Sequence, residues 1–162
     1  MASYQAPEGL NVGHVHLKVS DLARAEAFYR DVLGLKVTQR YGSQAVFLSA
    51  GGYHHHVGLN TWMSRGGKPP IAGSSGLFHV AFLYPKRADL ARAVKQVLAC
   101  GVELEGAADH GVSHAVYFRD PDENGIELYW DLPREDWPMD AQGGMEMVTD
   151  LLDLVGLLAE AR

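Results

Sequence analysis

The chain has 162 residues, 47% of them hydrophobic, which is enough to bury the core of one ordinary domain. A formal net charge of -6 and the lack of a basic cluster argue against binding to nucleic acid or to an anionic membrane surface. The single cysteine, Cys100, allows no internal disulfide, and we find no signal-peptide pattern and no apolar run of about 18 residues, so we expect a cytoplasmic protein.

The first part of the chain, about residues 11–62, is predicted to form a strand, a helix and three further strands. The first strand alternates strictly and places His14 and His16 on its polar face. Asp21 is a suitable N-cap for the helix, and Gly34 a suitable end. The expected elements are a strand at 13–20, a helix at 22–33 and strands at 35–38, 45–48 and 53–60.

The same order of elements then recurs after a Gly/Pro/Ser-rich linker at residues 63–76. This second unit covers about residues 77–131, and an extension follows at 132–162. The extension is predicted to end in a helix over residues 150–161, whose leucines are too many for one exposed stripe, so this helix packs on its own domain or on a partner subunit. We expect a homodimer or a larger ring. The expected elements of the second unit are a strand at 78–84, a helix at 88–99 and strands at 102–105, 115–119 and 126–130.

A literal sequence match supports an internal repeat. The five residues of 21–25, Asp-Leu-Ala-Arg-Ala, recur at 89–93, each shortly after a strand that contains His-Val. The matching order predicts a single α+β domain in which two βαβββ repeats form a half-open mixed-sheet barrel, followed by the C-terminal helix. In that barrel the first strands of the two units bring His14 and His79 to equivalent positions, and the last strand of the second unit brings Glu127.

Two imidazoles and one carboxylate on neighbouring strands form a ligand set that leaves coordination positions open. This set is characteristic of non-haem Fe(II) oxygenases, and it also suits Mn(II) or another divalent ion. The residues alone leave open a less specific interpretation, in which each histidine is a satisfied core residue and Glu127 lies on the wet face of a sheet.

Several stretches carry a resemblance to a known family. They are GHVHLKVSDL at 13–22, YHHHVGLN at 53–60, HGVS at 110–113 and DPDENGIELYW at 120–130. The chain resembles the vicinal oxygen chelate superfamily, which includes glyoxalase I, bleomycin-resistance proteins and type I extradiol dioxygenases. The likeness is greatest to single-domain catechol 2,3-dioxygenases.

The resemblance implies roles for individual residues. His14, His79 and Glu127 match the metal ligands of the family, which implies Fe(II), or Mn(II) in its place. His110 and Tyr117 match a histidine and a tyrosine that contact the substrate or the attacking oxygen. The family's proton-moving histidine matches His55, although the alignment can slip to His54 or His56.

The resemblance also implies a reaction, with two alternatives. The expected activity is extradiol cleavage of a catechol-type aromatic diol by O2. A glyoxalase-like isomerase or lyase is the first alternative, but it needs a fourth ligand, and the last strand of the first unit offers only His56 and no acid. A small-molecule binding protein of the bleomycin-resistance kind is the second, although such proteins usually lack the complete ligand set.

Overall fold

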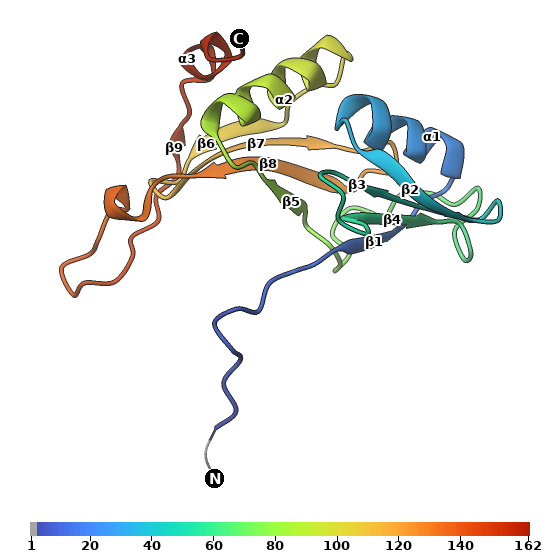
Figure 1. Ribbon diagram of the computed structural model, residues 1–162, viewed down its shortest axis with the longest axis horizontal. Coiled ribbons are helices and arrows are strands. Elements are labelled where there is room, and N and C mark those ends of the chain that lie inside the picture. Colours follow the sequence, from blue (N-terminus) through green and yellow to red (C-terminus); the bar gives the residue numbers. More distant parts are fainter. Residues whose placement is uncertain (1–2) are drawn as a thin grey trace.

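The computed structural model describes residues 3–162 as two βαβββ units that lie side by side (Figure 1). Unit one contains β1 (Val15–Lys18), α1 (Leu22–Ala27), the π-helical turn η1 (Phe28–Val32), β2 (Lys36–Tyr41), β3 (Ala45–Ser49) and β4 (Val57–Asn60). Unit two contains β5 (Val80–Leu83), α2 (Arg87–Ala99), β6 (Gly106–Asp109), β7 (Ser113–Arg119) and β8 (Gly125–Asp131). The extension adds the 3-10 turn η2 (Arg134–Asp136), β9 (Asp150–Leu151) and α3 (Leu154–Ala159).

The two units have the same strand topology, which confirms the predicted α+β fold with two repeats. Their sheets have the orders β1-β4-β3-β2 and β5-β8-β7-β6-β9. In each sheet the first strand of the unit pairs in parallel with the last, and the other pairs are antiparallel. The first strands, β1 and β5, are both edge strands with one side unpaired. Within residues 3–162 the sheets form no closed barrel.

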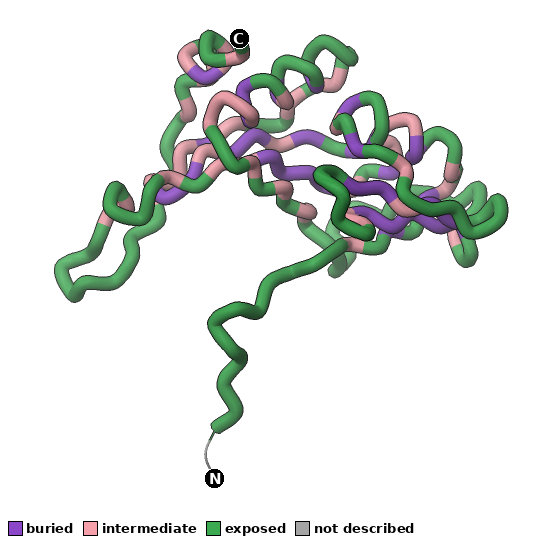
Figure 2. Tube along the Cα trace, viewed as in Figure 1, coloured by how far each residue is buried: buried purple, intermediate pink, exposed green. Residues whose placement is uncertain are grey.

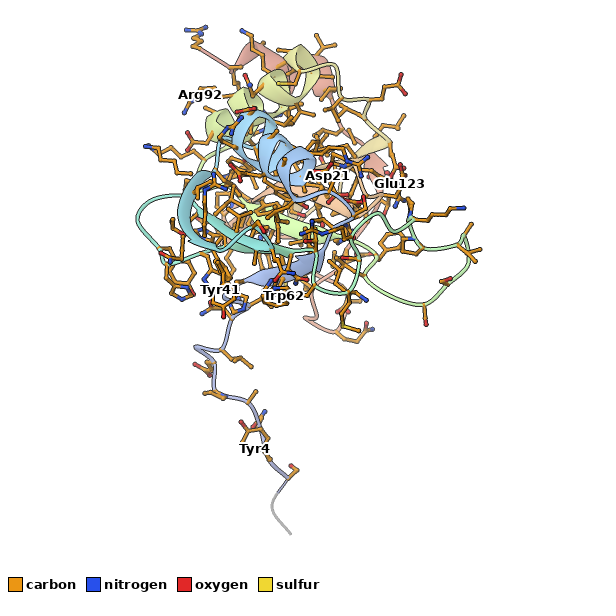
Figure 3. The ribbon with its side chains drawn as sticks, turned by 90° about the vertical axis from the view of Figure 1, so that its right-hand side faces the viewer. Tyr4, Asp21, Tyr41, Trp62, Arg92 and Glu123 are labelled. Carbon is orange, nitrogen blue, oxygen red and sulfur yellow. The ribbon has the colours of Figure 1, made fainter. Side chains whose placement is uncertain are left out.

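Helices α1 and α2 lie on the same side of the two sheets (Figure 1), and the core fills the space between these helices and the sheets. Buried stretches follow the strands and the inner turns of the helices, whereas the N-terminal arm from residue 3 is exposed along its length (Figure 2). The alternation of β1 distinguishes the two faces of the sheet. Leu17 is buried on the face that meets the helices, whereas His16 is exposed on the opposite face. Trp62, which contacts the ring of His16, lies on the side of the sheet away from α1 (Figure 3).

Polar contacts, the first of them fully buried, join the two units. The hydroxyl of Tyr29, in η1, donates to Oδ2 of Asp120 at 2.9 Å, and the two residues are 0% and 3% exposed. Arg24 of α1 forms an ion pair with Asp122 at 2.9 Å, and Gln96 of α2 donates to the carbonyl of Asp31 at 2.8 Å. The buried apolar side chains of both units belong to one cluster. The units therefore pack as one body.

Two of the expected elements are wrong. The strand predicted at 102–105 lies at Gly106–Asp109, whose sequence has no alternating pattern and whose place is set by pairing with β7. The long terminal helix is also shorter than predicted, because residues 150–151 extend the sheet beside β6. Asp153 then caps α3 by accepting from the amide of Gly156 at 2.9 Å.

None of the helices formed within residues 3–162 has the length and apolar character needed to cross a membrane.

Candidate functional site

The centre of the site in unit two is a contact between His79 and Glu127. Glu127 is at mid-strand in β8, where its neighbours Ile126 and Leu128 face the core, so its own side chain faces away from the helices. His79 comes directly before β5, the strand that pairs with β8. Its Nε2 lies 2.9 Å from Oε2 of Glu127. A carboxylate that is only 9% exposed requires such a partner, because burial of an unpaired charge costs several kcal/mol (about 3–5 when one partner is removed).

Tyr117 and His110 extend this contact into a hydrogen-bonded chain. The hydroxyl of Tyr117, on β7, donates to Oε1 of Glu127 at 3.2 Å and lies 2.8 Å from Nε2 of His110. Nδ1 of His110 lies 2.9 Å from the carbonyl oxygen of Val148. A carbonyl oxygen only accepts, so Nδ1 carries the proton, and Nε2 of the neutral ring is an acceptor. One phenolic proton therefore has two acceptors within reach, Glu127 and His110.

The phenol of Tyr117 keeps its proton at neutral pH. Burial, and then the nearby Glu127 carboxylate, raises the pKa of Tyr117 to about 12. The site therefore offers a hydroxyl donor beside the carboxylate.

A cavity of about 270 Å³ opens beside this group and is large enough for a small organic molecule. Its lining combines His79 and Tyr117 with apolar groups and one ion pair between Glu105 and Arg119. Phe78 was not selected from the sequence as part of this wall, although its position directly before His79 could have indicated it. In the structure Phe78 is 83% exposed. The lining residues are Phe78, His79, Glu105, Gly106, Tyr117, Phe118, Arg119, Gly125 and Ile126.

The histidines of unit one form a second group. His14 is exposed, and its ring centroid lies 4.4 Å from that of His55 and 6.4 Å from that of His54. Nδ1 of His54 lies 2.8 Å from Nδ1 of His55. Burial, followed by the neighbouring histidines, lowers the pKa of His55. His56 points elsewhere, since its Nδ1 lies 2.9 Å from the hydroxyl of Ser49.

The predicted site residues thus fall into two groups rather than one. We call His14 and His55 the unit-one half-site, and His79, Glu127, Tyr117 and His110 the unit-two half-site. Within residues 3–162 no three His, Cys, Asp or Glu side chains are close enough to hold one metal ion. Of the three predicted metal ligands, His79 and Glu127 are in contact, and His14 lies against the rings of His54 and His55.

The unit-two half-site fits a divalent ion. Two donor atoms that bind one ion at about 2.1 Å and at right angles lie about 3 Å apart. The 2.9 Å between Nε2 of His79 and Oε2 of Glu127 matches this separation. Nδ1 of His79 is buried and has no hydrogen-bond partner among the described residues. An imidazole and a carboxylate are suitable donors for Fe(II) or Mn(II).

Comparison with known sequences places this geometry in a family context. The family model described as the Glyoxalase/Bleomycin resistance protein/Dioxygenase superfamily matches residues 11–128. A catechol-2,3-dioxygenase of Bacillus subtilis (strain 168) is 43% identical over 100 residues, which cover 61% of this chain and 35% of that protein. The match thus spans about a third of the Bacillus relative.

Three further proteins show the range of the likeness. Biphenyl-2,3-diol 1,2-dioxygenase 3 of Rhodococcus globerulus is 33% identical over 145 residues, with 87% of this chain and 74% of that protein covered. A manganese-dependent 2,3-dihydroxybiphenyl 1,2-dioxygenase of Geobacillus genomosp. 3 is 27% identical over 129 residues, with 78% and 38% covered. The crystal structure of a lactoylglutathione lyase from Agrobacterium tumefaciens matches with a TM-score of 0.59 and 29% identity, covering 77% of this chain and 95% of that one.

Proposed function

The chain belongs to the glyoxalase/bleomycin resistance protein/dioxygenase superfamily, and on that premise we propose that it is a metal-dependent extradiol dioxygenase acting on a catechol-type diol with O2. The observation that carries the proposal is the contact of His79 with Glu127 beside a cavity of small-molecule size. The relatives named as dioxygenases support the reaction class, and the chemistry of the donor atoms supports the metal.

The proposed metal ligands are His14, His79 and Glu127, and the proposed ion is Fe(II), with Mn(II) as the alternative. A divalent ion bound by these residues would supply Lewis-acid polarisation of the diol and open coordination positions. His79 contributes a neutral nitrogen and Glu127 a negative oxygen, so the unit-two half-site neutralises part of the charge of the ion.

The remaining side chains position the substrate and move protons. Tyr117, which keeps its proton at neutral pH, can donate a hydrogen bond to an oxygen of the diol that enters the cavity. The same proton is within reach of Glu127 and of His110, so a bound diol oxygen would replace one of these two acceptors. We assign proton transfer to His55, because it is the member of the histidine run that lies against His14 at 4.4 Å. The ring centroid of Phe47 lies 5.0 Å from that of His55, so Phe47 forms part of the surroundings of His55.

A glyoxalase-like isomerase is the second candidate, favoured by the likeness to the lactoylglutathione lyase of Agrobacterium tumefaciens. That activity requires a fourth protein ligand from the last strand of unit one. The last strand of unit one, β4, contains no acidic residue, and the nearest imidazole, His56, lies with its Nδ1 2.9 Å from the hydroxyl of Ser49. The dioxygenase therefore remains the better supported function.

The test is to load anaerobically purified protein with Fe(II) or Mn(II) and to follow a panel of catechols for a yellow ring-cleavage product. Glu127→Ala should lose most of the bound metal and the activity, because a three-residue ligand set becomes two. His55→Ala should keep the metal and slow turnover by about 10²-fold or more, as expected for loss of a general acid–base group. His16→Ala, two residues after His14 in the sequence, is the matched control and should change neither. Activity on a glutathione thiol adduct with none on any catechol would select the isomerase instead.

A further inference from the structure

The C-terminal extension, residues 132–162, holds the ring of His110 from outside the two βαβββ units. The carbonyl oxygen of Val148 lies 2.9 Å from Nδ1 of His110, and the amide of Val148 donates to the carbonyl oxygen of His110 at 3.1 Å. Oγ1 of Thr149 lies 3.4 Å from the same Nδ1. Both the main chain and the ring of His110 are therefore bound by the extension.

Gly111 provides the seat on which the extension packs. Its φ is +74°, and a Cβ at this position would lie 2.9 Å from Cγ of Pro138 and 3.3 Å from Cγ2 of Val148. The amide of Glu146 donates to the carbonyl oxygen of Pro138 at 2.9 Å, which closes a hairpin. We call this hairpin and its base, residues 138–149, the strap. Its two ends meet on Gly111, which fixes the place of the Val148 carbonyl.

The last residues of the chain anchor the strap. Its continuation, β9, pairs with β6 at the edge of the sheet, and α3 then lies beside α2 (Figure 1). Leu157 of α3 is fully buried, and Glu160 forms an ion pair with Arg87 at the start of α2. The extension thus passes around the edge of the sheet and is held at His110 on one side and at α2 on the other.

The contact with Val148 decides which ring nitrogen of His110 carries the proton. A neutral imidazole exists as two tautomers, and the hydrogen bond made by one nitrogen sets the state of the other. With the Val148 carbonyl as its partner, Nδ1 keeps its proton, so Nε2 faces the hydroxyl of Tyr117 at 2.8 Å as an acceptor. In the other tautomer Nε2 would carry the proton and would only donate to Tyr117.

We propose that Val148 is a positioning residue of the active site, which holds His110 in the tautomer that can receive a proton through Tyr117. This inference rests on the proposed function, in which a diol oxygen lies next to the Tyr117 hydroxyl. The proton of a diol hydroxyl moves to the oxygen of Tyr117 as the proton of Tyr117 moves to Nε2 of His110. The diol becomes an anion, Tyr117 stays neutral, and His110 ends as an imidazolium whose Nδ1–H is still bound by Val148.

The test is Val148→Pro in the metal-free protein. A proline ring in place of the N–H that lies 3.1 Å from the carbonyl oxygen of His110 would push the two main chains apart, so Nδ1 should lose its acceptor. Nitrogen NMR of histidine-labelled protein reports the tautomer of His110 directly, and His110→Asn identifies its signals. Wild type should show the Nδ1–H form alone, and Val148→Pro a mixture of both tautomers.

The matched control is Ala141→Pro, which places the same residue at an exposed position in the turn of the strap and should keep the wild-type tautomer. If Val148→Pro does not fold, Leu157→Ala takes its place, because it loosens the anchor of α3 and should also give a mixture of tautomers. Circular dichroism and metal content after anaerobic loading should equal those of wild type, which shows that the fold and the ligand set are intact.

Turnover of the catechol panel completes the test. Val148→Pro should lower kcat about tenfold or more and change KM by less than about twofold, as expected when a proton acceptor is lost rather than a binding contact.

The outcomes separate this inference from the proposed function. An unaltered His110 tautomer in the folded variant, or an altered tautomer with unchanged kcat, would overturn the inference and leave the dioxygenase proposal in place. A wild type that is inactive on every catechol would overturn the proposed function, and the NMR result would still decide whether Val148 sets the tautomer of His110.

Discussion

Removal of the Tyr29 hydroxyl should weaken the junction between the two units by a measurable amount. Tyr29→Phe deletes the O–H that donates to Asp120 and keeps the ring, which is fully buried. A hydrogen bond to a charged group contributes about 1.5–3 kcal/mol. Asp120 keeps three other donors, the amides of Asp122 and Asn124 and the side-chain amide of Asn124. The loss should therefore lie near the lower end, at about 1.5–2 kcal/mol.

The assay is urea unfolding of the metal-free protein, followed by tryptophan fluorescence and circular dichroism. For a chain of this length the same loss lowers the melting temperature by about 3–8 °C. Tyr41→Phe is the matched control, because Tyr41 is 68% exposed and its replacement should change stability by less than about 0.5 kcal/mol. If the two variants were equally stable, the buried hydrogen bond would not contribute to holding the units together.

Two further predictions concern the metal site of unit two and the ion pair between Arg40 and Glu26. A Cβ on Gly125 would lie 2.1 Å from the carbonyl oxygen of Phe78 and 3.1 Å from Cα of His79, so Gly125→Ala should force β5 from β8 and lower metal affinity at least about tenfold. Gly106→Ala, whose Cβ would meet the Tyr117 ring at 4.0 Å, should leave metal binding unchanged in the same titration.

Arg40, which donates to Glu26 at 2.7 Å, lowers the pKa of that carboxyl below its ordinary value of 4.5. This stabilisation is present above about pH 4.5 and is lost as the pH falls below it, so Glu26→Gln should reduce stability at pH 7 and flatten its acid dependence in denaturation experiments. If the stability of Glu26→Gln fell with pH as steeply as that of wild type, the ion pair would contribute nothing to stability.

The repeat could be predicted because local sequence patterns determine each of its elements. Alternation in 13–20 and 126–130, a cap at Asp21 and the turn residues after Asp120 each fix an element without reference to the rest of the chain. Glu127 was conspicuous for the same reason, since a carboxylate in mid-strand between apolar residues needs a partner, and His79 supplies it.

The placement of the two units relative to each other could not be predicted from sequence patterns. Whether two repeats close on each other or turn apart depends on contacts such as that of Tyr29 with Asp120, which are 91 residues apart in sequence. Periodicity shows which face of a strand is apolar, but it does not show which unit that face will meet. The position of β6 was missed for a similar reason, because its pairing partner determines it rather than its own residues.

The contacts of Asp120 join the two units, and this determines what cleavage of the chain between them would do. Its carboxylate accepts from Asp122 and Asn124, which shapes the turn ahead of β8, and from Tyr29, which belongs to the other unit. A protease that nicks the exposed linker at 63–76 would thus release no autonomous piece, since either fragment alone would leave a buried group without its partner. The two fragments should stay associated and co-purify, because the folding unit comprises both repeats.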